Sequence, residues 1–197
     1  MLYKSGFINQ KKKFILFLSV LLLLNFFFIN IVSADVCVWR DPERTMLRLF
    51  TQAEDYKTLV YKLTTEQIKS IEILLGEPLD DSEKHEFNIY AVNKDGQVLG
   101  WVMALVGVGE YGVIETVIGI NTDHSIRGAY LQRVRERKRK ALKSDEFLNQ
   151  FSGKKQVDEF QINPVAGAEK ASAEISQLIK KMLAFDAVLN RQQKLKP

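Results

Sequence analysis

The first pattern along the chain is one long apolar run from Phe14 to Val32, broken only by Ser19, Asn25 and Asn30. Four lysines precede the run (Lys4, Lys11, Lys12 and Lys13), and the small residues Val32-Ser33-Ala34 follow it. This order predicts a secretory signal that is cleaved after Ala34. The run is also nearly long enough to cross a bilayer, so an uncleaved membrane anchor is the alternative. Both interpretations place the remaining chain outside the cytoplasm, in the periplasm or tethered facing it.

Helical spacing dominates the next stretch. Asp41-Pro42-Glu43 has the features of a helix start, with a capping residue, a proline in the first turn and an acid beside it. The apolar residues that follow at helical spacing are Met46, Leu47, Phe50 and Ala53. A second helix is predicted after Thr64, which forms a capping-box pattern with Gln67, and Gly76 is expected to end it. Residues 35–80 are therefore expected to form a helical N-terminal extension after the signal or anchor of residues 1–34.

The pattern then changes to alternation. Phe87, Ile89 and Ala91 alternate with polar residues, and further strands are predicted over 97–106, 113–120 and 126–133 with short turns between them. Short connections favour antiparallel neighbours. The chain ends in a predicted helix over 168–189, and its apolar stripe consists of Ala171, Ile175, Leu178, Ile179, Met182 and Phe185. The sequence thus predicts an α+β domain over residues 81–197: a twisted antiparallel sheet with helices packed on one face and at both ends.

Charge and cysteine content narrow the functional classes. The predicted signal contains four lysines and none of the 24 acidic residues. The formal net charge of +4 therefore falls to zero in the chain that follows it. A balanced charge argues against general nucleic-acid binding. Cys37 is the single cysteine, which excludes an internal disulfide. Asp35 stands where a lipid-attachment motif needs a small or apolar residue, which argues against lipidation of Cys37.

The sequence contains little that suggests catalysis. His85 and His124 lie in polar, turn-like surroundings without a partner at metal-ligand spacing, so we expect surface histidines and no metal site. No nucleophile elbow, Ser-His-Asp order or phosphate-binding Walker loop is present. These absences argue against a conventional hydrolase and predict no catalytic residues.

Two small-residue segments are candidates for binding. The turn 107–112 is rich in glycine, so its backbone N–H groups could approach a phosphate or a ring edge, although a plain strand connection is the simpler interpretation. The segment 163–168 opens the C-terminal helix, where unpaired N–H groups and the positive end of the helix dipole suit a phosphate. A plain small-residue helix start is the alternative there.

The order of these pieces resembles the FMN-binding domain of exported electron-transfer proteins, which include flavin subunits of the Rnf and Na+-translocating NADH:quinone reductase complexes. The matching pieces cover about half of the chain, and they read IYAVNKDGQVLGWV, GVGEYGVIETVIGINTDHSIRGAYL, FLNQFSGKK and PVAGAEKASAEISQLIKKML. The resemblance implies an FMN phosphate near Gly167, Ala168, Glu169 and Ser172, and a flavin ring near Tyr111 and Gly112.

The attachment motif of that family is degenerate in this chain. The family carries a hydroxyl residue that is esterified to the FMN phosphate, and Glu169 occupies its position after Ala166-Gly167-Ala168. A carboxylate cannot form that phosphoester, and its charge repels a phosphate. Covalent FMN at Glu169 is therefore excluded, and any flavin is expected to be non-covalent, while Ser172 supplies the trailing hydroxyl of the motif.

A second departure lies after the last predicted strand. The family has a Glu-Thr-Pro-Gly loop there, whereas this chain has Arg135-Glu136-Arg137-Lys138, which lacks helix breakers and is expected to continue as helix. The basic run around it is either a solvated face or a docking surface for a redox partner or for anionic lipid. Its cations are Arg133, Arg135, Arg137, Lys138, Arg139 and Lys140.

Two functions follow from the resemblance and its departures. The leading hypothesis is an exported FMN-binding-domain protein that takes part in membrane-associated electron transfer, with non-covalent flavin if flavin is present. The alternative is a flavin-free relative that serves as an assembly or docking module for a redox complex. Either would be an electron-transfer or accessory protein rather than a stand-alone enzyme.

Overall fold

Five strands form one antiparallel sheet whose spatial order, β1-β2-β3-β4-β5, is also their order in the sequence. The structure is a computed structural model, and it describes residues 42–84 and 86–193. The strands are β1 (Asp55–Lys62), β2 (Glu86–Lys94), β3 (Gln97–Val108), β4 (Val113–Asn121) and β5 (Ile126–Val134). The α+β class and the antiparallel meander predicted from the alternation are confirmed.

Tight turns with the expected residues join the central strands. Asp95 and Gly96 both have positive φ (49° and 74°), as the two-residue hairpin between β2 and β3 requires. Between β4 and β5, Asp123 Oδ1 accepts hydrogen bonds from the backbone N–H of Ser125 (3.0 Å) and from its hydroxyl (2.6 Å). The hydrogen bonds from Ser125 are the main cause that holds the pKa of the Asp123 carboxyl far below its ordinary value.

The helices are short except for the last one. They are α2 (Pro42–Leu49), α3 (Thr65–Leu75), the 3-10 helix η1 (Asp81–Lys84), α4 (Arg139–Leu142), α5 (Asp145–Leu148), the 3-10 helix η2 (Asn149–Phe151) and α6 (Glu169–Gln193). The predicted capping box of α3 is present: Thr64 Oγ1 accepts from Gln67 N at 3.3 Å, and Gln67 Oε1 accepts from Thr64 N at 2.7 Å. Gly76, at φ 74°, ends the helix as predicted.

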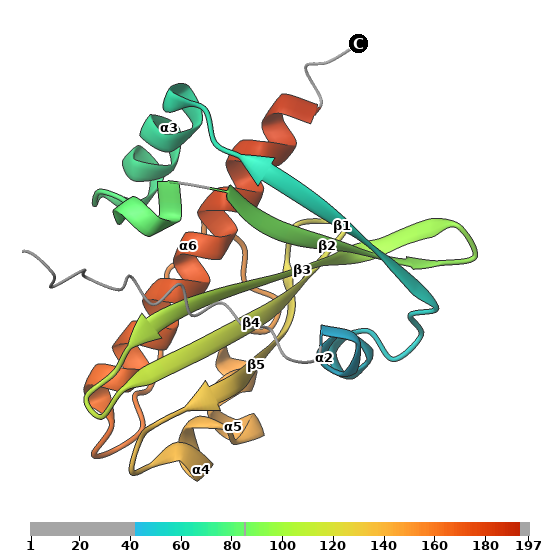
Figure 1. The fold of residues 1–197 in the computed structure, drawn as a ribbon. Coiled ribbons are helices and arrows are strands. Elements are labelled where there is room, and N and C mark those ends of the chain that lie inside the picture. The colour runs from blue at the N-terminus through green and yellow to red at the C-terminus, as the bar shows by residue number, and fades with distance from the viewer. Residues whose placement is uncertain (1–41, 85, 194–197) are drawn as a thin grey trace, which may run out of the picture. The chain divides into compact units, whose positions relative to one another are not determined.

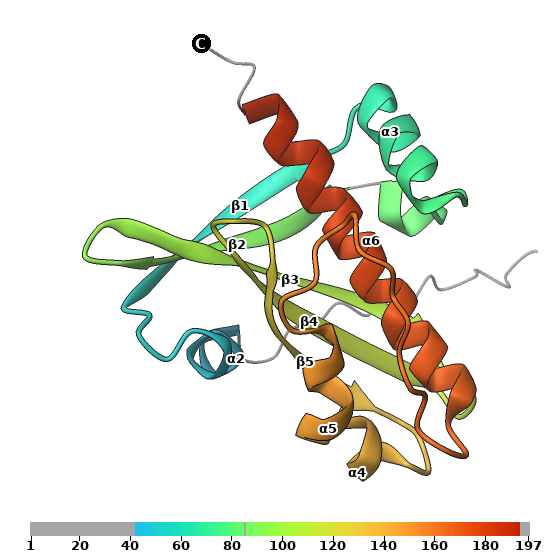
Figure 2. The same ribbon diagram turned by 180° about the vertical axis from the view of Figure 1, so that it is seen from behind.

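Helix α6 runs along one face of the sheet, with α3 beside it (Figures 1 and 2). The predicted stripe is fully buried, since each of its six residues is at most 2% exposed. The stripe packs on the apolar residues that β3 and β4 direct to this face, among them Met103, Ile114 and Ile118. Burial of each large apolar side chain contributes about 1.5–3 kcal/mol, so this layer holds the domain together.

Helix α2 packs on the opposite face of the sheet, in addition to the helices that were expected on one face and at both ends. Phe50, 1% exposed, joins Met46 in a second cluster with Val92, Val102 and Val117. The Phe50 ring lies directly over the glycine backbone of β3 and β4, because a Cβ on Gly100 would be 2.8 Å from the ring. Phe50, which follows directly after α2, thus attaches this helix to the sheet. The helical spacing of Met46 and Phe50 had placed both among the apolar residues of this segment.

Strand β1 was not predicted, and it pairs with β2 over its whole length, from Asp55 opposite Asn93 to Lys62 opposite Glu86. At the other edge, the segment after η2 pairs with the start of β5: Ile126 donates to Lys154 O (2.8 Å), and Gly153 donates to Ile126 O (2.7 Å). The region expected to be a helical extension therefore also supplies a strand of the sheet.

Several sequence predictions fall outside the described residues. These are the apolar run, the cleavage position, Cys37, Asp41 and His85. Within residues 42–84 and 86–193, no helix combines the length and apolar character needed to cross a bilayer.

Candidate functional site

The predicted binding residues come together at one end of the domain, from three segments far apart in the sequence. These are the β3–β4 hairpin, the segment that follows β5, and the start of α6, which lie together in both ribbon views (Figures 1 and 2). Tyr111 N donates to Glu136 Oε1 at 3.0 Å, which links the hairpin to the segment after β5. Lys138 Cε lies 3.4 Å from where a Cβ on Gly167 would stand, which links that segment to α6.

The first turn of α6 is closed by a carboxylate of the chain itself. Glu169 Oε1 accepts a hydrogen bond from Gly167 N at 2.8 Å, and Gly167 has the positive φ of 74° that this tight turn requires. Hydrogen bonds from the N–H groups of Gly167 and of Glu169 lower the pKa of this carboxyl, so it is charged at neutral pH. The negative charge stabilises the helix start. The position suited to a phosphate is therefore filled by Glu169.

Ser172 is buried and both of its hydrogen-bonding functions are in use. The residue is 0% exposed, its hydroxyl donates to Ala168 O at 2.9 Å, and its Oγ accepts from Val165 N at 3.0 Å. Ala168 is also buried, at 3%. The hydroxyl at the trailing position of the motif thus holds the loop before α6 in place, and it is not accessible from the surface.

The glycines of the β3–β4 hairpin are covered by acidic side chains. A Cβ on Gly107 would overlap the carboxylate of Glu174 on α6, and a Cβ on Gly109 would overlap that of Glu136. Glu136 is itself only 6% exposed. The absence of side chains at these glycines therefore admits two carboxylates of the same chain rather than leaving open backbone for a phosphate.

Tyr111 and Gly112, the residues predicted to lie near a flavin ring, are covered by arginine side chains. The guanidinium carbon of Arg137 lies 4.6 Å from the ring centroid of Tyr111, a cation–π contact on a ring whose residue is 44% exposed. Gly112 faces Arg135, whose Cβ is 3.2 Å from the position of an added Cβ. Tyr111 and Gly112 are thus at the site, with the basic segment packed over them.

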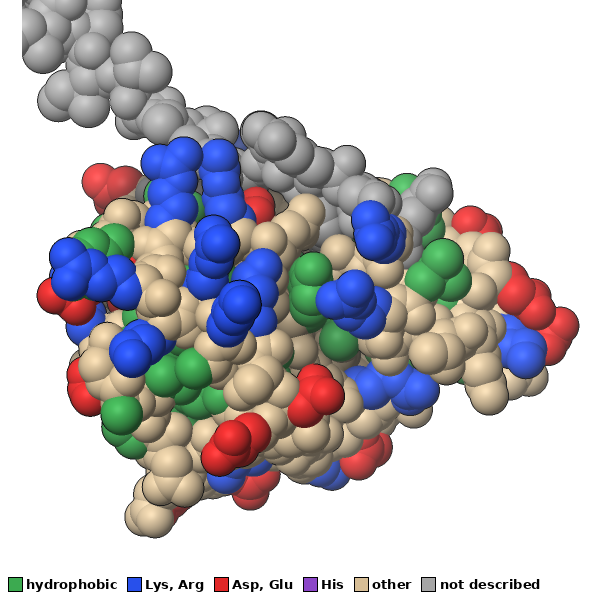
Figure 3. Space-filling view, turned by 90° about the horizontal axis from the view of Figure 1, so that it is seen from below, with side chains coloured by type: hydrophobic (Ala, Val, Ile, Leu, Met, Phe, Trp, Pro, Cys, Tyr) green, Lys and Arg blue, Asp and Glu red, His purple; other side chains and the backbone are tan. Residues whose placement is uncertain are grey.

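The basic segment departs from its predicted helix. Residues 135–138 form an irregular turn, and α4 begins only at Arg139. Glu136 explains the difference, since its side chain turns inward to the Tyr111 N–H while its backbone O accepts from Arg139 N at 3.3 Å. The chain therefore bends at Glu136 instead of continuing as a helix from β5. The cations of this run gather with others on the face that carries α4 and α5 (Figure 3).

His124 has more contacts than the sequence suggested. Its ring stacks on Trp101 with a centroid distance of 5.7 Å and an interplanar angle of 7°, and its Nδ1 lies 2.9 Å from Oδ2 of the buried Asp186. The side chain keeps 35% of its surface exposed, so His124 lies at the surface as expected, but its surroundings are not only polar because the ring also stacks on Trp101. Neither Trp101 nor Asp186 is near His124 in the sequence, so no local signal marked the cluster. The described residues hold no group of three or more His, Cys, Asp and Glu that suits a metal ion.

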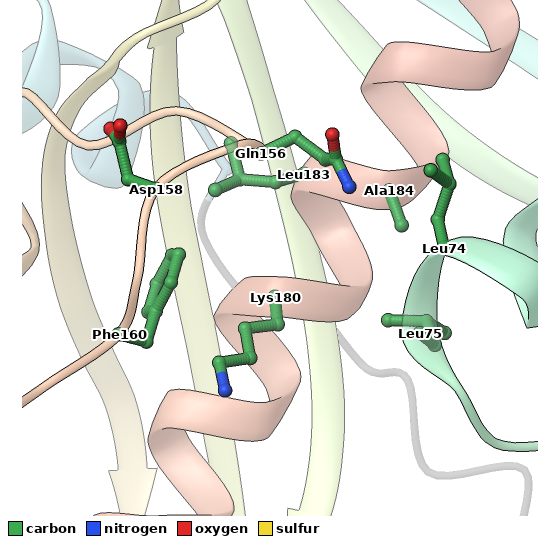
Figure 4. Close-up of a pocket in the computed structure, with 8 residues that line it drawn as sticks. All are labelled: Leu74, Leu75, Gln156, Asp158, Phe160, Lys180, Leu183 and Ala184. Atoms are coloured by element: carbon green, nitrogen blue, oxygen red, sulfur yellow. The ribbon is translucent and has the colours of Figure 1, made fainter.

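A hollow of about 200 Å³ lies away from these residues, between α3, the middle of α6 and the segment 156–160 (Figure 4). It is lined by Leu74, Leu75, Gln156, Asp158, Phe160, Lys180, Leu183 and Ala184. Lys180 is about 16 Å along the helix axis from Glu169, at 1.5 Å per residue. The hollow is also below the roughly 300 Å³ at which pockets for small-molecule ligands begin. It is not the predicted flavin site.

Similarity to known proteins is found among solved structures. No family model matches the chain, and no curated protein matches it. Among solved structures, the chain is similar to the crystal structure of Shewanella oneidensis NqrC, with a TM-score of 0.46 and 12% sequence identity over 73% of this chain and 87% of that chain.

The residues present do not fit a covalently held FMN. Glu169 has no hydroxyl to esterify, its carboxylate occupies the N–H groups at the start of α6, and the Ser172 hydroxyl is buried and hydrogen-bonded. What the arrangement offers instead is a closed, charged end of the domain whose surface is formed by arginine and lysine side chains.

Proposed function

We propose that this protein is an exported, flavin-free relative of the FMN-binding domains and serves as a docking or assembly module of a membrane-associated electron-transfer system. The observation that carries the proposal is the Glu169 carboxylate on the Gly167 N–H at 2.8 Å, since it fills the place that a flavin phosphate would need. Export rests on the pattern of the first 34 residues, and the redox setting rests on the resemblance of residues 87–183 to the family.

Two further contacts support a closed site. The Ser172 hydroxyl is engaged by Val165 and Ala168, and the Tyr111 ring is covered by Arg137. A ligand of the size of FMN would have to displace a charged carboxylate from a helix start and an arginine from an aromatic ring. The exposed cations that surround this end remain available to a partner.

The test is flavin content. The full chain is produced in a host that has the flavin-transferring enzyme, and its visible spectrum and intact mass are recorded. We expect a colourless protein with no mass gain, and no flavin absorbance after FMN is added. A mass gain of one FMN on the wild-type chain would contradict the proposal and would point to a hydroxyl residue such as Ser172.

A matched pair of variants sharpens the test. Glu169→Thr restores a hydroxyl at the attachment position and removes the carboxylate from Gly167 N, so we expect it to gain FMN by mass under the same conditions. Glu146→Thr changes an exposed carboxylate in the first turn of α5 in the same way, away from the predicted binding residues, and we expect no gain.

Non-covalent FMN is the second candidate, and one observation favours it. Lys138 approaches Gly167, and Arg135 and Arg137 flank Gly112 and Tyr111, so positive charge surrounds the place of a phosphate. Flavin absorbance that co-purifies with the protein and is released on denaturation, without a gain in intact mass, would support this candidate over the docking module.

A further inference from the structure

Cations from separate elements gather around the ring of Tyr130, which belongs to β5. The guanidinium carbon of Arg48, on α2, lies 4.6 Å from the ring centroid, and Nζ of Lys143, just after α4, lies 5.9 Å from it. Arg139, at the start of α4, accepts a backbone hydrogen bond from Lys143 at 3.1 Å. We call Arg48, Tyr130, Arg139 and Lys143 the Tyr130 cluster. These residues meet only in the folded domain, since Arg48 comes from the region before the sheet.

The cations of the Tyr130 cluster have no direct ion-pair partner in the described part of the chain. Partial burial is the main cause that lowers the pKa of Lys143, and the charges of Arg139 and Arg48 lower it further. Like charges held together in this way repel one another, and an anion brought to the cluster would relieve the repulsion.

The cluster is part of a broader basic face. Between residues 127 and 143 the sole acidic residue is Glu136, which is buried. The exposed cations of the same stretch outside the cluster are Arg127, Arg135, Arg137, Lys138 and Lys140. Figure 3 shows lysine and arginine side chains spread over this face, with a smaller number of acidic side chains among them. Many cations on long, flexible side chains suit a surface of many mobile anions.

We propose that this face binds the anionic headgroups of a lipid bilayer. The apolar run ends at Val32, and α2, which carries Arg48, begins at Pro42. If the run stays in the membrane, ten residues of extended chain reach at most about 35 Å, which limits how far the start of α2 can move from the lipid surface. This inference rests on the proposed function in placing the domain at a membrane, and it adds which face meets the lipid.

Electrostatic attraction of this kind has a known scale. Each Lys or Arg near an anionic membrane surface favours the bound state by about fivefold, and the effect fades within a Debye length of about 10 Å at 0.1 M salt. Removal of the three cations of the cluster should therefore lower, by about 100-fold, the ratio of molecules whose basic face is bound to lipid to molecules whose basic face is free. High salt should lower the same ratio for the wild-type chain.

The experiment uses the full chain in vesicles of phosphatidylcholine alone and in vesicles that also contain phosphatidylglycerol. Cys37→Ser removes the native thiol, and a spin label is placed at Ala141→Cys on the basic face or at Ile73→Cys on α3, both exposed positions. Access of a water-soluble relaxing agent to each label is measured. We expect the Ala141 label to lose access in phosphatidylglycerol vesicles only, and the Ile73 label to keep it in both.

Charge variants give the matched comparison. The triple variant Arg48→Gln, Arg139→Gln and Lys143→Gln should restore access at the Ala141 label, whereas Lys57→Gln, Lys62→Gln and Lys69→Gln, which remove equal charge elsewhere, should not. Equal access of the Ala141 label in both kinds of vesicle would overturn the proposal, as would equal effects of the two triple variants. Protection that needs an added acidic protein and is absent with lipid alone would overturn it as well. Flavin content does not enter this measurement, so it and the flavin test can fail separately.

Discussion

The ammonium nitrogen of Lys181 lies 2.9 Å from Oε1 and 3.0 Å from Oε2 of Glu83, and this contact joins α6 to the 3-10 helix η1 across 98 residues of sequence. Both side chains are nearly buried, at 10% and 11% exposed. The carboxylates of Glu77 and Asp80 lie 4.0 Å from the same nitrogen. One lysine of the long helix thus holds the segment between α3 and β2.

Replacement of this lysine should destabilise the domain. In Lys181→Met the Glu83 carboxylate stays nearly buried without its counter-charge, which should lower the free energy of unfolding by about 1–3 kcal/mol. Urea denaturation followed by circular dichroism measures the change. Lys170→Met, at an exposed position in the first turn of α6, is the control and should change stability little. Equal losses in the two variants would show that the ion pair contributes nothing.

The same pair predicts a dependence on alkaline pH. Burial acts to lower the pKa of Lys181, but the hydrogen bonds to Glu83 and the nearby carboxylates of Glu83, Asp80 and Glu77 raise it overall. A raised lysine pKa gives stability that is complete below the unfolded value of about 10.4 and is lost as pH rises through the folded value. The stability difference between wild type and Lys181→Met should therefore be constant near neutral pH and shrink as pH rises above about 10.4. A difference that already falls between about pH 7 and pH 9 would contradict this assignment.

Gly100 is predicted to tolerate no side chain. A Cβ there would overlap the backbone O of Ile120 and come within 2.8 Å of the buried Phe50 ring, and neither can move freely. Gly100→Ala should cost at least about 1–3 kcal/mol, the usual range for overpacking. Gly128→Ala is the matched control on β5, since its Cβ would make an ordinary 3.5 Å contact with Leu49. Thermal unfolding should separate the two variants clearly, and similar melting temperatures would mean that α2 does not pack on the sheet as described.

The capping box of α3 gives a local prediction. Thr64→Ala removes the oxygen that accepts from Gln67 N, and it should destabilise the domain by about 1 kcal/mol. Thr65→Ala, one residue later and exposed, should leave stability unchanged or raise it slightly because alanine favours helix. Chemical denaturation of the two variants checks the order, and a larger loss in Thr65→Ala would exclude Thr64 as the cap.

The Glu169–Gly167 hydrogen bond should be visible in an acid titration. Backbone hydrogen bonds lower the pKa of Glu169, so the charged form persists below the usual midpoint of about 4.3 and is lost as pH falls through the lowered value. The amide proton of Gly167 should shift in nuclear magnetic resonance spectra at that lower pH. The amide of Gly153, which donates to Ile126 O, should not follow, and Glu169→Gln should remove the Gly167 step. A Gly167 amide that is insensitive to Glu169 would refute the closed helix start.

Periodicity and caps predicted most of the fold. Alternation located β2 to β5, the stripe from Ala171 to Phe185 located α6, and Thr64 and Gly76 marked the ends of α3. Strand β1 was missed because its residues are mostly exposed and its apolar positions, such as Leu59, Val60 and Tyr61, do not alternate cleanly. An edge strand receives much of its stability from pairing with a neighbour, and a local pattern does not contain that contribution.

The site was predictable in chemistry but not in geometry. That Glu169 cannot carry a phosphoester follows from its side chain alone. The geometry depends on how β3, β4 and α6 are brought together. Glu136 reaches Tyr111 N, which lies 25 residues earlier in the sequence, and Glu174 covers Gly107. The His124–Asp186 contact spans 62 residues and was likewise out of reach of any local pattern.

The two outer strands of the sheet differ in what they offer to another chain. At β5, the pairing of Ile126 with Gly153 and Lys154 occupies backbone groups that an incoming strand would need. At β1, the lysines Lys57 and Lys62 are exposed along the edge strand. Occupied backbone groups and edge lysines are two ways in which proteins resist strand-by-strand self-assembly. The domain therefore carries one of them at each end of its sheet, which favours a monomeric sheet over growth into fibrils at high local concentration.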